Sequence, residues 1–174
     1  YVRNLETRPV LTKCVTSAAI SAGADATCQY LESTKKKFDF ARFGKFTLLG
    51  MVLVGPTLHY WYGYLARNFA ENSMLNVLKR LALDQLVFTP GFITVFMSSV
   101  LVLDGRPENI PEKLSSDFFT TLMANYSVWV PAMFLNFKFI PFQFQVLFSN
   151  GVGYMWNVYL SYASHKKVEN KARR

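Results

Sequence analysis

The apolar residues of this chain gather into five segments, separated by short stretches that hold most of the charge. The segments run over residues 11–31, 46–66, 81–103, 118–137 and 139–164. A helix of about 20 apolar residues is long enough to cross the hydrocarbon core of a bilayer. The pattern therefore predicts an all-α integral membrane helical bundle with four transmembrane helices. A fifth helix would cross if the first segment, which carries Lys13 and Asp25, also enters the membrane.

The positive charges favour four crossings over five. If the last four segments cross and the first does not, 15 of the 19 Lys and Arg residues lie on one side of the membrane and 4 on the other. With five crossings the division is 7 against 12. Positive residues collect on one side of membrane proteins, so the biased arrangement is preferred, with both termini on the same side. We expect a single membrane domain, residues 1–174, that ends in a polar tail, residues 165–174.

The turn between the last two segments and the prolines inside the others predict the shape of the helices. Between the segments 118–137 and 139–164 only Lys138 and, shortly after it, Pro141 interrupt the apolar run. So short a connection predicts a tight helical hairpin. Kinks are expected at Pro56, Pro90 and Pro131, because each ring removes a backbone donor and frees the carbonyl four residues earlier. Membrane helices often tolerate such kinks. Alternatively, the kinked helices open a polar cavity around a shared axis.

Ionisable and amide side chains inside the apolar segments are the candidate functional residues. A charge in hydrocarbon is costly, so Asp25, His59 and Asp84 should face the bundle, form a pair or meet water. Arg80 lies one helical turn from Asp84, and Gln29 lies one turn from Asp25, so local pairs are available. The polar residues expected to line a pore or the bundle interior are His59, Asp84, Gln85, Asn136, Gln143 and Asn157.

Composition and charge narrow the classes of function. The net charge is +8, but the charges lie in short loops and tails and form no basic helix face with interleaved aromatics, which argues against nucleic acid as a partner. Cys14 and Cys28 are four turns apart in one candidate helix, beyond the reach of a disulfide. The two histidines lack zinc-site spacing, and no nucleophile elbow or phosphate-binding loop occurs. We therefore expect no enzyme activity, no metal and no cofactor.

A series of individually weak matches runs in a fixed order from Tyr1 to Tyr162. It includes Gly55-Pro56 and Asp84-Gln85, and it closes with Trp129, Pro131, Asn136, Phe137, Pro141, Trp156 and Asn157. In this order the residues resemble the Mpv-seventeen / peroxisomal-membrane-protein-22 family. Two departures concern the interior: Met133 stands where the family commonly has a glutamine, and Gln143 and Gln145 stand where a basic residue is frequent.

The resemblance implies a small four-helix protein of the mitochondrial inner membrane, with the peroxisomal or a plastid membrane as alternatives. Members of the family look like weakly selective channels for small solutes. The first hypothesis is therefore a channel or permeability modulator in the lipid bilayer, lined by the six polar residues above. The alternative is a non-catalytic accessory subunit that packs against other membrane proteins or as a homo-oligomer. A face of small residues, Ala18, Ala22 and Ala26, suits such contacts.

Overall fold

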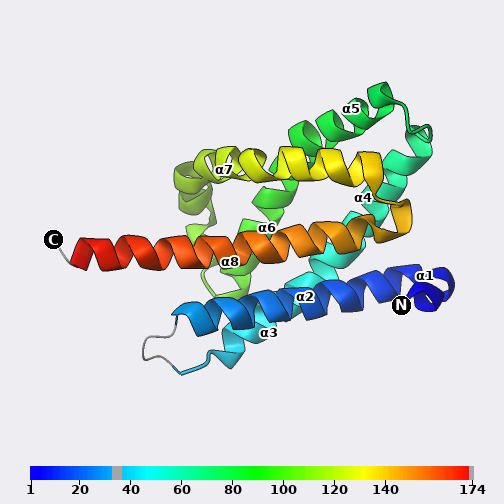
Figure 1. The fold of residues 1–174 in the computed structure, drawn as a ribbon. Coiled ribbons are helices and arrows are strands. Elements are labelled where there is room, and N and C mark those ends of the chain that lie inside the picture. The colour runs from blue at the N-terminus through cyan, green and yellow to red at the C-terminus, as the bar shows by residue number, and fades with distance from the viewer. Residues whose placement is uncertain (33–36, 173–174) are drawn as a thin grey trace. The chain divides into compact units, whose positions relative to one another are not determined.

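The computed structural model describes residues 1–32 and 37–172, with side chains as far as residue 159 (Figure 1). Its elements are α1 (Val2–Thr7), α2 (Pro9–Glu32), α3 (Phe40–Leu49), η1 (Gly50–Val54), α4 (Gly55–Asn68), α5 (Met74–Leu83), η2 (Asp84–Phe88), α6 (Thr89–Leu103), η3 (Pro107–Asn109), α7 (Ile110–Phe139), η4 (Phe142–Phe144) and α8 (Gln145–Ala172). No strand occurs among the described residues, which confirms the all-α prediction. Of the expected polar tail, residues 165–172 continue α8, and residues 173–174 lie outside the described part.

Two helical stretches within the described residues are long and apolar enough to cross a membrane. The first is Met74–Leu103, in which α5, η2 and α6 follow one another without a break. The second is Pro107–Phe139, made of η3 and α7. The other apolar segments are helical as well, in α2, in the continuous run from α3 to α4, and in α8. The structure thus supports two of the four expected crossings.

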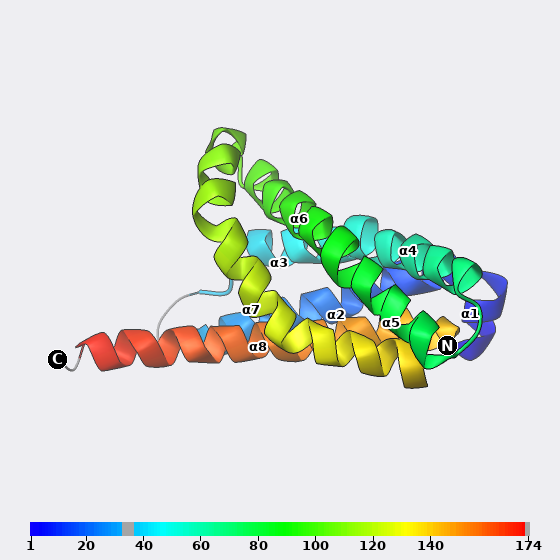
Figure 2. The ribbon, with the colours of Figure 1, turned by 90° about the horizontal axis from the view of Figure 1, so that it is seen from above.

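A π-helical turn precedes each of the first two mid-span prolines. The amide of Gly55 donates to the carbonyl of Gly50, five residues back, just before Pro56. The amide of Thr89 donates to the carbonyl of Asp84 in the same way, just before Pro90. A wider turn of this kind accommodates a residue without an N–H group, and such turns are common at functional sites. The third proline, Pro131, lies inside α7 without a π-helical turn, and α7 bends along its length (Figure 2).

Two compact units make up the chain, and the first contains residues Tyr1–His59 and Val146–Arg174. In this unit α2 packs against α3 and η1 at very short range. A Cβ atom on Gly50 would lie 2.6 Å from Ser21 Oγ, and one on Gly55 would lie 2.6 Å from the Cα atom of Cys14. Small side chains on both sides allow this approach. The contact face of α2 therefore includes Cys14, Ser17 and Ser21.

The second unit contains residues Tyr60–Gln145, and larger side chains hold it together. Its buried core includes Tyr62, Leu65, Val77, Met133 and Phe137, each at most 3 % exposed. A ladder of aromatic rings joins α4 to the stretch from η2 to α6, with neighbouring centroids 4.8 to 6.1 Å apart, through Tyr64, Trp61, Phe88, Phe92 and Phe96. Aromatic pairs at these separations add to the free energy gained by burial.

Candidate functional site

A buried carboxylate, that of Asp84, lies in η2 of the second unit and is 3 % exposed. Trp61 Nε1 donates to Asp84 Oδ1 at 2.8 Å, and Gln85 Nε2 donates to Oδ2 at 2.7 Å. Both donors are neutral, and no side chain in the described part of the chain forms an ion pair with Asp84. A carboxylate held in this way keeps hydrogen bonds but lacks a counter-ion, which is an expensive arrangement inside a protein.

The ion pair that the sequence made available between Asp84 and Arg80 is not formed. Arg80 Nη2 instead donates to the backbone carbonyl of Phe69, in the loop that follows α4. An acidic residue four positions after a basic one is the less favourable order for a helical pair. The two opposite charges therefore lie one turn apart on one helix and bind different, neutral partners.

The backbone carbonyl of Gln85 is bonded from a neighbouring helix. Because η2 is π-helical, the donor that would serve this carbonyl belongs to residue 90, and Pro90 has no N–H group. The hydroxyl of Tyr126 in α7 donates to it instead, at 2.8 Å. The sequence predicted that Pro90 would free the carbonyl four residues earlier, at Leu86. The wider turn moves the freed carbonyl to Gln85 and brings α7 to it.

Asn136 forms a second buried polar group in the same unit. It is 0 % exposed, and its Nδ2 donates to the carbonyl of Gln145 at 3.3 Å and to Met133 Sδ at 3.7 Å. Tyr62 also donates its hydroxyl to Met133 Sδ, at 3.7 Å. Met133, at the position where the family often has glutamine, is thus a sulfur acceptor in the core. These contacts tie the end of α7 to the start of α8.

Three other polar residues that the sequence suggested for the interior are His59, Gln143 and Asn157. Gln143 is exposed in η4, outside the buried core of the described residues. Gln145 is the buried glutamine there, at 4 % exposure, with its Nε2 donating to the carbonyl of Ile140. His59 is half-buried and belongs to the first unit. Asn157 is exposed, and its backbone carbonyl accepts from Cys28 Sγ at 3.4 Å.

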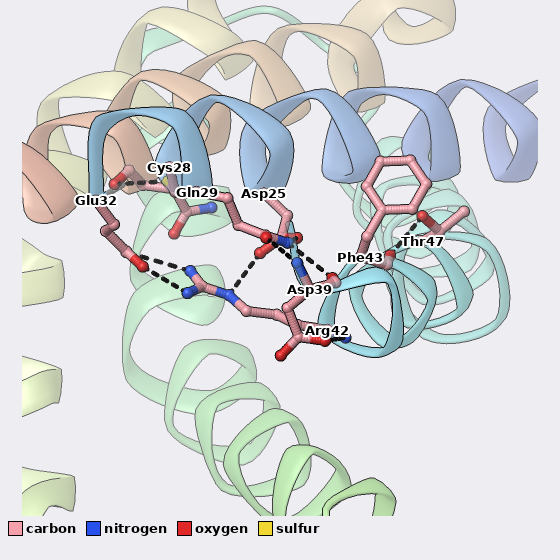
Figure 3. Close-up of polar contacts among 9 residues, drawn as sticks. Asp25, Cys28, Gln29, Glu32, Asp39, Arg42, Phe43 and Thr47 are labelled. Atoms are coloured by element: carbon pink, nitrogen blue, oxygen red, sulfur yellow. Dashed lines mark hydrogen bonds and ion pairs between the residues drawn. The ribbon is translucent and has the colours of Figure 1, made fainter. Parts of the chain in front are cut away.

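The first unit contains a charged cluster in which α2 and α3 meet (Figure 3). Arg42 Nε lies 2.7 Å from Asp25 Oδ1, and Arg42 Nη1 lies 2.6 Å from Glu32 Oε2. Gln29 Nε2 donates to Asp25 Oδ2 at 2.7 Å, which confirms the predicted local contact. Gln29 also bonds both backbone groups of Asp39, whose own side chain caps α3. The cluster joins the two helices on either side of their connecting loop.

Arg42 is the central cation of this cluster, and the sequence interpretation gave it no part in a site. Its guanidinium lies between two carboxylates, that of Asp25 at 2.7 Å and that of Glu32 at 2.6 Å. A signal was present in the sequence. Asp25, Gln29 and Glu32 share one helix face at spacings of four and three residues, and Asp39 is placed to cap the helix that carries Arg42.

Comparisons with known proteins identify the family. A family model described as the Mpv17 / PMP22 family matches residues 101–161, from the end of α6 into α8. The chain is 38 % identical over 169 residues to PXMP2/4 family protein 3 of Dictyostelium discoideum, which covers 96 % of this chain and 90 % of that relative. The chain belongs to the Mpv17 / PMP22 family. This confirms the resemblance found in the sequence.

The names of two other relatives give the membrane in which each is found. Peroxisomal membrane protein 2 of Bos taurus is 34 % identical, over 92 % of this chain and 86 % of the relative. Mitochondrial inner membrane protein Mpv17 of Caenorhabditis briggsae is 29 % identical, over 91 % of this chain and 87 % of the relative. No solved structure matches the chain.

Some residues of the family pattern lie in packed contacts, and others lie at the surface. Phe137 is buried edge-on against Tyr62, and Trp156 stacks on Tyr159. Pro131 and Pro141 are exposed, and Trp129 is half-buried. Within the described residues, no group of His, Cys, Asp and Glu is arranged to hold a metal ion. The chemistry that the polar groups offer is hydrogen bonding and charge.

Proposed function

We propose that this member of the Mpv17 / PMP22 family is a weakly selective channel for small solutes in an organellar membrane. The observation that carries the proposal is the carboxylate of Asp84, buried with neutral donors in Met74–Leu103. An ionisable group within an apolar membrane helix is rare, and it commonly marks a solute or ion pathway. The mitochondrial inner membrane is the proposed location and the peroxisomal membrane the alternative, by analogy with the named relatives.

The proposed topology keeps four crossings. Two of them are Met74–Leu103 and Pro107–Phe139. The others are the continuous helix from Phe40 to Asn68 and the apolar part of α8. With the apolar segments 46–66, 81–103, 118–137 and 139–164 of these helices inside the membrane, 15 of the 19 Lys and Arg residues lie on one side, as the positive-inside rule favours.

The π-helical turns support a passage because they leave backbone groups without helical partners. The carbonyl of Gln85 accepts from Tyr126 rather than from its own helix. The side-chain Oε1 of Gln85 is buried without any partner in the described residues. Irregular backbone of this kind inside a membrane is found where it is buried in protein or lines a water-filled space. A passage with few charged groups discriminates weakly among solutes.

Reconstitution tests the proposal. The full chain, purified in detergent, is placed in planar bilayers, and conductance is compared with protein-free bilayers. We expect conductance that Asp84→Asn changes in size or in its preference for cations. The matched control is Asp117→Asn, which removes the same charge from a side chain that is 43 % exposed and paired with Lys113, and it should leave conductance nearly unchanged. If the full chain conducts no more than empty bilayers, the channel proposal is wrong.

A non-catalytic accessory subunit is the second proposal. It is supported by the close pairing of most buried polar groups within each unit, since the contacts of Asn136 and Tyr126 hold helices together whether or not solute passes. Large apolar side chains that are exposed, such as Leu86 and Phe119 at 69 % each, would face lipid or partner helices. Extraction in a mild detergent distinguishes the two: an accessory subunit co-purifies in stoichiometric amounts with other chains, and a protein recovered only as a monomer contradicts it.

A further inference from the structure

We propose that Arg80 forms the centre of a binding site for a phosphate-type oxyanion, at the end of the second unit where α4, α5 and α7 meet. Arg80 is 7 % exposed, and the Nε atom of its guanidinium is buried. No carboxylate in the described part of the chain pairs with it. This site is separate from Asp84 and does not depend on the channel proposal.

The hydrogen bonds of Arg80 leave most of its donors unused. Nη2 donates to the carbonyl of Phe69, and Nε is buried without a partner among the described residues. A guanidinium has five N–H donors in a planar fork that fits a carboxylate or a phosphate with two parallel bonds. A buried cation with free donors and no counter-ion is expensive, and an oxyanion would supply both the charge and the acceptors.

A second cation lies at the same end of the unit. Lys138 Nζ, at the end of α7, donates to the carbonyl of Asn72 at 3.3 Å, and Asn72 Nδ2 donates to the carbonyl of Lys138 at 3.1 Å. These bonds hold the end of α7 beside the loop 69–73, the same loop that accepts from Arg80 (Figure 2). The acidic residue of the loop, Glu71, is exposed and forms no ion pair with either cation in the described residues.

The depth of Arg80 favours phosphate among oxyanions. The helix Met74–Leu103 has 30 residues, which at 1.5 Å per residue is about 45 Å. The hydrocarbon core of a bilayer is about 30 Å thick, so one end of this helix extends into the headgroup layer. In the proposed topology the apolar run that crosses the hydrocarbon core starts at Leu81, so that Lys79 and Arg80 precede it and lie in that layer. Phosphate there comes from a phospholipid headgroup or from solution.

Two arms of one binding experiment separate these sources. The full chain in neutral detergent receives inorganic phosphate in one arm, with chloride at equal ionic strength as reference. In the other arm it receives phosphatidylglycerol, with phosphatidylcholine as reference. Binding is read from the rise in the unfolding temperature by tryptophan fluorescence, and from retained lipid by native mass spectrometry. A response in the lipid arm alone assigns a headgroup site, and a response to inorganic phosphate assigns a site for the free anion.

The variants compare two neighbouring basic residues. Arg80→Gln should weaken binding at least about tenfold, because charged hydrogen bonds to the anion are lost. Lys79→Gln removes the same charge from an exposed residue on the same helix and should leave binding nearly unchanged. Equal losses in both variants, or no binding by the unaltered chain in either arm, would overturn the proposal.

If Arg80→Gln does not fold, two further variants decide the question. Arg80→Lys keeps the charge and loses the fork, so binding should weaken but persist. Lys138→Gln should weaken binding by a smaller factor, because its amine is the outer cation of the site. Binding that neither variant changes would contradict the assignment.

Discussion

A buried carboxylate is paired with a cation in the first unit of the molecule, whereas the buried charges of the second unit are bonded to neutral groups. In the first unit, Asp25 and Arg42 come from different helices and meet at 2.7 Å. In the second, Arg80 and Asp84 lie one turn apart on one helix, are both buried, and do not pair. A buried pair is strongly destabilised when one partner is removed, whereas a buried charge without a partner already carries the cost of leaving water. The first cluster therefore joins two helices, and the second unit contains the two charges, unpaired within the described residues, on which the proposals rest.

The two units also differ in how closely their helices pack. The first unit brings α2 against η1 and α4 through glycines with almost no space to spare, while the second unit uses large aromatic rings. Close backbone contact leaves little freedom to move, because a shift of either helix removes or overlaps the contact. Four substitutions test this comparison.

The largest effect is expected for Gly55→Ala in the first unit. The added Cβ would lie 2.6 Å from the Cα atom of Cys14, and backbone atoms cannot rotate away. We expect the free energy of unfolding in detergent to fall by about 3 kcal/mol or more. The matched control is Gly91→Ala in α6 of the second unit, where no atom lies within 4 Å of the added Cβ. That change should stabilise the helix by about 0.5–1 kcal/mol, and an equal loss in both variants would contradict the comparison.

Removing the cation of the first cluster should have the next largest effect. Arg42→Gln leaves Asp25 buried without a counter-ion, and we expect a loss of about 3 kcal/mol in the same unfolding measurement. Glu32→Gln removes the more exposed partner of Arg42 and should cost no more than about 1 kcal/mol. If the two variants lose equal stability, Asp25 is not the partner that matters.

The hydroxyl of Tyr126 is expected to contribute less. Tyr126→Phe leaves the carbonyl of Gln85 without a donor, because Pro90 cannot supply one. The cost of a buried, unpaired acceptor is about 1–3 kcal/mol. Tyr60→Phe serves as the control, because Tyr60 is 61 % exposed. A loss confined to Tyr126→Phe would show that the π-helical turn depends on α7, and unchanged unfolding would show that another donor, such as water, replaces the hydroxyl.

The sequence was sufficient to predict the helices, because their apolar runs are long and the charges lie between them. It also located Asp25 beside Gln29, a contact within one helix turn. It failed where the geometry depends on register or on distant segments. The π-helical turn moved the freed carbonyl from Leu86 to Gln85, and it was not foreseeable from the spacing of prolines. Gln143 and Gln145 are equally polar in sequence, and only the short turn η4 decides which is buried.

The smallest change in stability is expected for Asp84→Asn. Its size shows whether Asp84, like Asp25, is a charge on which the stability of the protein depends. The Oδ1 atom of an asparagine still accepts from Trp61. Its amide would face the amide of Gln85, but Gln85 Oε1 has no partner in the described residues, so rotating that side-chain amide turns an acceptor toward the new donor. Because the uncompensated charge disappears, the free energy of unfolding should stay within about 0.5 kcal/mol of its original value or rise. A loss comparable to that of Arg42→Gln would mean that Asp84 is a structural charge, like Asp25, and would remove the main support for a solute pathway through the second unit.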